Sequence, residues 1–242
     1  MQHIVDNLPY LLDGLFVTLY VTALAWLVMM ATAFALGFAR YYGNRPARWS
    51  SGLVVGLFRG TSTFVMLFWA FYVLPQFGVT LTPIVTGVLV LGITEGCYLA
   101  EGVRGSLASV TRGQAEAARV LGLSPWQTMA RVVLPQALPT MIAPIGNFTI
   151  ALLKFTSLLS FISVQDLTSR MQSLRYQVGD SIVLFGVLLV VYYLLSTALG
   201  WLFRYLERRA SVRGTGRPPE AGHGAAAAPP VTEPTGGEVA LR

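Results

Sequence analysis

Apolar residues fill long runs of this chain, and polar residues collect between the runs. Five runs are close to the 20 or so residues that a helix needs to cross the hydrocarbon core of a bilayer, at residues 12–38, 53–74, 81–100, 139–164 and 181–205. The fourth run is interrupted by Pro144 and Asn147. The pattern therefore predicts an all-α, polytopic membrane protein with five transmembrane helices.

Composition and charge support a membrane location. The 242 residues are 54% hydrophobic and only 12% charged, and the mean hydropathy of +0.61 lies well above that of soluble domains. Arginines follow the first, third and fifth runs: Arg40, Arg45, Arg48, Arg104, Arg112, Arg119, Arg131, Arg204, Arg208, Arg209, Arg213 and Arg217. Only Arg170 and Arg175 follow the fourth run. By the positive-inside rule the N-terminus lies outside and the C-terminus in the cytoplasm.

The net charge of +6 does not predict a nucleic-acid partner. A nucleic-acid surface would need basic residues interleaved with exposed aromatic residues on one face, whereas these arginines follow the ends of apolar runs. The expected surroundings are membrane lipid.

The same pattern divides the chain into three parts. Residues 1–11 are predicted to be an extracytoplasmic N-terminal segment, and residues 12–209 a transmembrane domain with a polar cytoplasmic loop at about 105–138. Residues 210–242 are rich in Gly, Pro, Ala and Thr, so we expect a disordered cytoplasmic tail. No Lys or Arg precedes the first run, which favours a retained span over a cleaved signal.

The chain has few residues of the types that usually carry out catalysis. The two histidines, His3 and His223, stand near opposite ends of the chain, so a histidine-based nucleophile or metal site is not predicted. Cys97 is the single cysteine. The single lysine, Lys154, follows Leu153 and cannot belong to a Gly-Lys-Ser/Thr phosphate loop. We expect neither an enzyme nor a bound cofactor or metal.

The polar loop has the local signals of two short helices. Residues 114–121 are good helix formers, and Gly122 can end that helix in the left-handed conformation. Ser124, Pro125 and Gln127 can start a second helix through a capping box. Pro135 and Pro139 are expected to end it. By shape alone, an ordinary hairpin between two spans fits equally well.

The spacing of residues in this loop is more specific than its shape. Glu116-Ala117-Ala118 is followed after three residues by Gly122, and after nine more by Val132-Val133-Leu134-Pro135. This resembles the EAA loop of ABC-transporter permeases. The resemblance implies docking on an ATP-hydrolysing subunit, with these candidate coupling residues: Glu116, Ala117, Ala118, Gly122, Leu134 and Pro135.

Four polar residues within the runs are candidates for a substrate pathway: Glu95, Tyr98, Asn147 and Lys154. A charge near the bilayer centre costs about 2.5–3.5 kcal/mol on insertion scales, so it is normally turned to a cavity or a partner. Glu95 and Lys154 can pair, or line opposite walls of a cavity for a zwitterion; Lys154 can equally belong to a helix-packing pair. Glu101 and Arg104 are predicted to form a structural pair.

Two stripes of glycine recur at every fourth position. Gly52, Gly56 and Gly60 form one, and Gly92 and Gly96 form the other. Such stripes allow close approach between helices, so we expect both to pack within the helical bundle.

Residues 12–209 resemble the polar-amino-acid (histidine, glutamine, arginine type) branch of ABC importer permeases. Besides the EAA loop, the stretches that carry the resemblance are Phe58-Arg59-Gly60-Thr61, Tyr98-Leu99-Ala100-Glu101 with Arg104-Gly105, and Leu152-Leu153-Lys154 with Thr156-Ser157-Leu158. The resemblance implies a type I importer permease fold in the bacterial cell (cytoplasmic) membrane. It also implies a cytoplasmic ABC ATPase dimer, an extracytoplasmic solute-binding protein, and a second permease subunit, identical or homologous.

Some positions depart from that branch. Ser62 and Phe155 replace its usual residues, and Glu95 stands where a small or apolar residue is usual. Other stretches are more similar to its ectoine/hydroxyectoine permeases: residues 59–62, Phe68-Trp69 and Asp166-Leu167-Thr168 with Arg170, Gln172, Leu174 and Arg175. The predicted function is transport of a polar amino acid or an amino-acid-derived compatible solute. The rivals are an ion-gradient-driven secondary transporter and a membrane partner that transports nothing.

Overall fold

The computed structural model describes residues 7–179 and 181–214, within which every regular element is helical. The elements in chain order are α2 (Leu8–Tyr42), α3 (Arg45–Gly60), α4 (Thr63–Phe68), η1 (Trp69–Val73), η2 (Leu74–Phe77), α5 (Pro83–Ala108), α6 (Arg112–Val120), α7 (Pro125–Thr128), η3 (Met129–Val133), α8 (Leu134–Phe155), η4 (Thr156–Ile162), α9 (Leu167–Val178) and α10 (Ser181–Gly214). Of these, η1 and η3 are π-helical and η2 and η4 are 3₁₀-helical. The all-α prediction is confirmed.

Four helical segments are long and apolar enough to cross a membrane: Leu8–Tyr42, Pro83–Ala108, Pro125–Ile162 and Ser181–Ala210. A fifth candidate is a pair of segments, Arg45–Gly60 and Thr63–Phe77, bent by 98°. The described part of the chain thus has four continuous candidate spans, or five if the bent pair counts as one.

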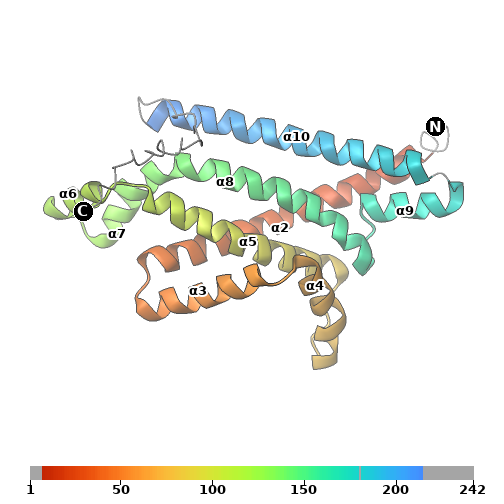
Figure 1. Cartoon of the computed structure of the whole chain (residues 1–242), viewed down its shortest axis with the longest axis horizontal. Helices are drawn as coiled ribbons and strands as arrows, with labels where there is room; N and C mark the ends of the chain where they lie inside the picture. The colour runs from red at the N-terminus through yellow and green to blue at the C-terminus, as the bar shows by residue number, and fades with distance from the viewer. Residues whose placement is uncertain (1–6, 180, 215–242) are drawn as a thin grey trace, which may run out of the picture.

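The bend corrects the straight helix expected over residues 53–74. Thr61 is extended, with φ −112° and ψ 145°, and its hydroxyl donates to the carbonyl oxygen of Leu57 at 2.9 Å. Ser62 is also extended and starts α4. Two successive extended residues break the helical hydrogen-bond ladder, and α4 turns sharply away from α3 (Figure 1).

The core lies where α2, α5 and α8 meet. Met29 of α2, Leu91 and Leu99 of α5, and Met141 and Leu152 of α8 are all fully buried. By contrast, only 6% of the residues in the most apolar stretch of α10 are buried. Most of the apolar surface of α10 therefore faces outward, as expected of a helix in contact with lipid or another subunit.

The two glycine stripes behave differently. A Cβ added to Gly92 would lie 2.6 Å from the Cβ of Val28, and one added to Gly96 would lie 2.6 Å from the Cβ of Thr32. These glycines let α5 lie directly against α2, as predicted. Residues 52, 56 and 60 of α3, however, have no atom within 4 Å of an added Cβ. Packing of that stripe within the bundle was a wrong prediction, because α3 turns it away from the other described helices.

Pro135 and Pro139 do not end the helix that starts at Pro125. The π turn η3 shifts the hydrogen-bond register just before Pro135, which then occupies the first turn of α8, where no backbone N–H is needed. Pro139 and Pro144 lie inside α8. Residues 125–162 form one continuous helical segment.

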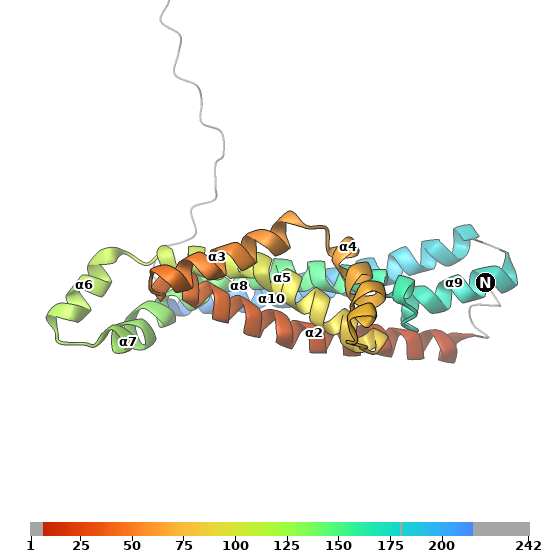
Figure 2. The same ribbon diagram turned by 90° about the horizontal axis from the view of Figure 1, so that it is seen from below.

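The long helices lie side by side along one axis (Figures 1 and 2). At one end lie the turn between α2 and α3, the α6–α7 loop and the last turns of α10; at the other lie α9 and the start of α2. The segments rich in arginine therefore share an end. Helix α10 continues to Gly214, beyond the predicted tail boundary at residue 210, and the rest of that tail lies outside the described residues.

Candidate coupling loop and polar pathway

Helix α6 ends in a Schellman motif centred on Gly122. The glycine has φ +78°, and its N–H donates to the carbonyl of Arg119 at 2.9 Å. The N–H of Leu123 reaches back to the carbonyl of Ala118 at 3.1 Å. These two bonds are the ones that define the motif, and they require the left-handed conformation that glycine adopts most readily. The predicted conformation of Gly122 is confirmed.

Helix α7 starts with the predicted capping box. The hydroxyl of Ser124 accepts from the N–H of Gln127 at 3.3 Å, and the side-chain oxygen of Gln127 accepts from the N–H of Ser124 at 2.9 Å. With the Schellman motif next to it, the turn between α6 and α7 is specified at both ends by local hydrogen bonds.

The loop exposes large apolar side chains at a polar end of the molecule. Val120 is 87% exposed, Leu121 81% and Trp126 77%. Exposure of such large apolar side chains to water is unfavourable. Glu116 and Ala117 are exposed beside them on α6. We call Glu116, Ala117, Val120, Leu121 and Trp126 the loop patch.

The other predicted coupling residues lie elsewhere. Ala118 is buried at 4% exposure, on the inner side of α6. Leu134 is half-buried and packs against the main core. Pro135 is exposed in the first turn of α8 and lines a groove between α8 and α10. The motif therefore combines exposed residues on α6 with a buried residue of the same helix, Ala118, and with two residues at the start of α8, Leu134 and Pro135.

Glu101 of α5 gathers arginines from three helices at the same end of the molecule. Its carboxylate contacts the guanidinium of Arg40 from α2, accepts from Nε of Arg104 at 2.8 Å, and lies 3.9 Å from Nη1 of Arg59 at the end of α3. The Glu101 side chain is 21% exposed. The Glu101–Arg104 pair was predicted from its spacing, but Arg40 and Arg59 were missed because they are distant in sequence.

We expect Glu101→Gln to destabilise the fold by about 2 kcal/mol, in the range for charged hydrogen bonds. The amide keeps the volume but leaves Arg40, Arg59 and Arg104 without their shared negative charge. The measurement is the thermal unfolding midpoint of the purified protein in detergent.

Asp13→Asn is the matched control for that variant. The Asp13 side chain is 76% exposed and 3.5 Å from Arg170 Nη1, a surface pair worth little. Equal midpoints for the two variants would show that Glu101 does not hold the three helices together.

Tyr98 lies on the face of α5 that turns toward α8, and Glu95 precedes it by three residues, about one helical turn. Glu95 is 2% exposed. Tyr98 stacks on Phe148 of α8, with ring centroids 6.2 Å apart, and its hydroxyl donates to the carbonyl of Arg59 at 3.0 Å. The ring of Tyr98 also lies 5.5 Å from the Arg59 guanidinium. Tyr98 thus joins α3, α5 and α8.

Asn147 and Lys154 are exposed on α8 and separated by seven residues, which places them on one face of the helix. Among the described residues no ion pair links Lys154 to Glu95. Lys154 instead lines a pocket of about 500 Å³ between the end of α8 and α10, with Ser157, Thr168 and Tyr192. The Thr168 and Tyr192 hydroxyls are 3.1 Å apart.

The structure separates the four predicted pathway residues into two pairs. Glu95 is buried and Tyr98 is half-buried between helices, whereas Asn147 and Lys154 are exposed. Sequence reasoning did not assign Thr168 or Tyr192 to the pathway, because hydroxyl residues are common in membrane helices; Thr168 was named only within the stretch that resembles the ectoine permeases. Across residues 7–179 and 181–214, no three His, Cys, Asp or Glu side chains come together as a metal site would require.

Comparison with known proteins matches most of the chain. Residues 28–212 match the family described as binding-protein-dependent transport system inner membrane component. The chain is 38% identical over 208 residues to the probable amino-acid ABC transporter permease protein y4tF of Sinorhizobium fredii, which covers 84% of this chain and 87% of that protein. It is 35% identical over 202 residues to the L-cystine transport system permease protein TcyB of Bacillus subtilis, covering 83% and 86%.

A third relative is the glutamine transport system permease protein GlnP of Escherichia coli, 31% identical over 207 residues, with 85% of this chain and 94% of that protein covered. Among solved structures, an amino acid ABC transporter crystallised with histidines superimposes with a TM-score of 0.79 at 27% identity, covering 85% of this chain and 96% of that one. The MetNI methionine ABC transporter, with a TM-score of 0.73 at 19% identity, covers 85% and 98% and shows the same fold.

Proposed function

This chain belongs to the family of binding-protein-dependent transport system inner membrane components, as a permease component of an amino-acid ABC importer, and we propose that ATP hydrolysis in a partner subunit drives it through the α6–α7 loop. It is a membrane protein with the type I importer permease fold. Membership implies an ATPase partner and a substrate-binding protein.

The loop patch is the observation that carries the proposal. A separate ATPase would cover Val120, Leu121 and Trp126, whose exposure at a polar end is otherwise unfavourable. Glu116 and Ala117 lie beside them, and Gly122 sets the angle between α6 and α7. The charge excess at this end supports a cytoplasmic position for the loop, with the N-terminus outside.

We assign the solute pathway to the exposed face of α8. Lys154 and Asn147 would be unfavourable against lipid, because a charge in the hydrocarbon costs about 2.5–3.5 kcal/mol on insertion scales. A water-filled path shared with a second permease subunit would accommodate both. The uncovered glycine stripe of α3 supports such a partner, identical or homologous, since it allows another helix to approach closely.

An α-amino acid fits this pathway through its carboxylate, which the Lys154 ammonium can bind. Glu95 and Tyr98 would line or support the pathway from the α5 side, although Glu95 is enclosed in the conformation described. The names of the relatives favour cystine, glutamine or a similar polar amino acid. Ectoine or hydroxyectoine, favoured by the stretches around Arg59 and Asp166, is the second candidate because it is also zwitterionic.

Reconstitution in liposomes tests the function. The chain, its ATPase and its binding protein should together accumulate a labelled amino acid only when ATP is present. Glutamine, cystine, histidine and ectoine, offered one at a time, identify the solute. Uptake driven by an ion gradient without the ATPase would instead establish a secondary transporter, and no uptake under any condition would favour a non-transporting partner.

We expect Lys154→Gln to lower uptake at least about ten-fold, the effect of losing one charge-assisted hydrogen bond. Lys154→Arg, which keeps the charge, should retain most of the activity. Both variants should be present in the membrane at normal levels, because Lys154 is exposed and no core contact is lost. Wild-type uptake by Lys154→Gln would remove Lys154 from the solute path.

A further inference from the structure

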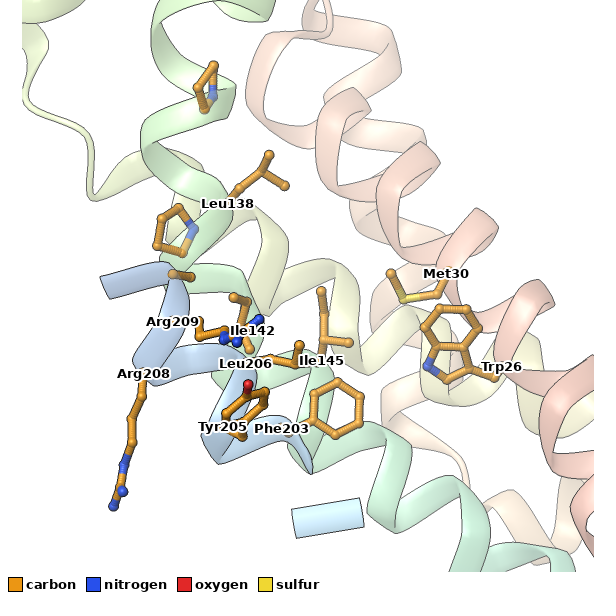
Figure 3. Close-up of a pocket in the computed structure, with 13 residues that line it drawn as sticks. Trp26, Met30, Leu138, Ile142, Ile145, Phe203, Tyr205, Leu206, Arg208 and Arg209 are labelled. Atoms are coloured by element: carbon orange, nitrogen blue, oxygen red, sulfur yellow. The ribbon is translucent and has the colours of Figure 1, made fainter. Parts of the chain in front are cut away.

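Two cavities on the described part of the surface differ in charge. One, of about 1180 Å³, is an apolar groove between α8 and α10, lined among others by Ile142, Ile145 and Phe203 (Figure 3). The other, of about 420 Å³, lies within the range of about 300–1,000 Å³ that is usual for small-ligand sites. Four arginines and one tryptophan line it, and we call them the arginine pocket: Arg40, Arg45, Arg48, Trp49 and Arg104.

Three helices form the arginine pocket at the end of the molecule that holds the α6–α7 loop (Figures 1 and 2). Arg40 lies in the last turn of α2, Arg45 begins α3, and Arg104 lies one turn before the end of α5. Each of these helices is a candidate membrane span or part of one, so the pocket lies where three spans end. Trp49 is 73% exposed there, and exposed tryptophan is typical of the interface between membrane and water.

The positive charge of the pocket is only partly balanced. The Glu101 carboxylate contacts Arg40 and accepts from Arg104 at 2.8 Å, so one acid serves both of these arginines. Within the described residues no acidic side chain forms an ion pair with Arg45 or Arg48, and both are exposed. They are three residues apart, which places them on one face of α3. Two guanidinium groups on that face are therefore available to an anion from outside the chain.

We propose that the arginine pocket is a phosphate-binding site, in which Arg45 and Arg48 hold the phosphate and Trp49 contacts the group that carries it. A guanidinium offers two parallel N–H donors, which match two oxygens of one phosphate. Guanidinium groups gathered in one pocket also repel one another, so a bound anion stabilises them. The site is separate from the Lys154 pocket and from the loop patch.

The expected carrier of the phosphate is the headgroup of an anionic phospholipid. Basic pockets between membrane helices on the cytoplasmic side bind such headgroups, and the arginine pocket lies at the ends of three spans. A soluble phosphomonoester offers the same chemical group. The experiment therefore separates these two sources.

Binding to the intact transporter in detergent is measured by native mass spectrometry, without ATP or a transported solute, so the outcome does not depend on the proposed coupling. Phosphatidylglycerol should bind at least about ten-fold more tightly than oleate, an anionic lipid without phosphate, the effect of about one charge-assisted hydrogen bond. Glycerol phosphate should not displace it if the source is a lipid. Displacement would keep the phosphate site but assign it to a soluble compound.

Variants of the pocket locate the binding. The double variant Arg45→Gln with Arg48→Gln should weaken it about 25-fold, because each basic residue near an anionic lipid contributes about five-fold. Trp49→Glu should abolish binding with all four arginines present, because it adds a carboxylate to the pocket, whereas Trp49→Phe should bind. The substituted side chains are exposed, so the thermal unfolding midpoint should stay within the normal range for surface changes.

Arg204→Gln is the matched control. Arg204 is an exposed arginine of α10 that does not line the pocket, so its loss should leave binding unchanged. Equal losses in Arg204→Gln and in the double variant would show a general effect of surface charge and overturn the proposal. Equal affinity for oleate would overturn it as well, as would wild-type binding by the double variant.

Discussion

Gly122→Val should abolish ATP-driven uptake while the protein still inserts in the membrane at a normal level. Gly122 has φ +78°, and a β-branched residue in that conformation loses on the order of 1 kcal/mol or more. No atom lies within 4 Å of an added Cβ, so the strain comes from the backbone alone. The α6–α7 turn should open and the loop patch should lose its shape.

The readouts are membrane level, co-purification of the ATPase, and uptake in liposomes. Gly122→Asn is the matched variant, because Asn tolerates the left-handed conformation better than any β-branched residue, and it should keep much of the uptake. Gly113→Ala, in the exposed part of α6, should have little effect. Wild-type uptake by Gly122→Val, with the ATPase bound, would contradict the role of this loop in coupling.

Gly96→Val should destabilise the whole fold by about 2 kcal/mol or more, as overpacking of a close contact does. Its Cβ would lie 2.6 Å from the Cβ of Thr32 and 2.9 Å from the carbonyl oxygen of Met29. The Met29 carbonyl is backbone and cannot move aside as a flexible side chain could. Helices α2 and α5 would have to separate along the central contact of the bundle.

The thermal unfolding midpoint and the yield of monodisperse protein report this effect. Gly105→Val makes the same change in the same helix, at an exposed position where an added Cβ meets nothing within 4 Å, so it should leave the midpoint nearly unchanged. If Gly105→Val lowers the midpoint as much as Gly96→Val, close packing at Gly96 is not the cause.

The elements predicted well from sequence are those decided by neighbouring residues. Gly122 ends α6, and Ser124 with Gln127 starts α7, because each cap is formed by side-chain and backbone groups within a few residues. The long apolar runs likewise predict the continuous helices, because a backbone buried in a membrane must satisfy its own hydrogen bonds, as a helix does. The predicted packing of Gly92 and Gly96 within the bundle is correct because α5 lies in the middle of the bundle, directly against α2.

The features missed depend on more distant contacts or on alternative backbone geometry. The π turn η3 lets the helix continue through Pro135, an outcome that proline preferences alone do not predict. The stripe from Gly52 to Gly60 looks like the one on α5, yet only the position of α3 decides what it faces. Glu101 meets Arg40 across 61 positions of sequence, a contact that only the packed bundle reveals.

The unbroken helix through η3 has a mechanical consequence. Trp126 in the loop patch and Lys154 on the polar face belong to the same rod, about 40 Å apart at about 1.5 Å of rise per residue. If the rod pivots as one body at its loop end, a tilt of about 5° carries Lys154 sideways by about 3.5 Å, about the length of a hydrogen bond. Had Pro135 broken the helix, the joint would absorb that swing. Under the proposed function, a movement too small to disturb a docked loop patch would therefore change what Lys154 is able to bind.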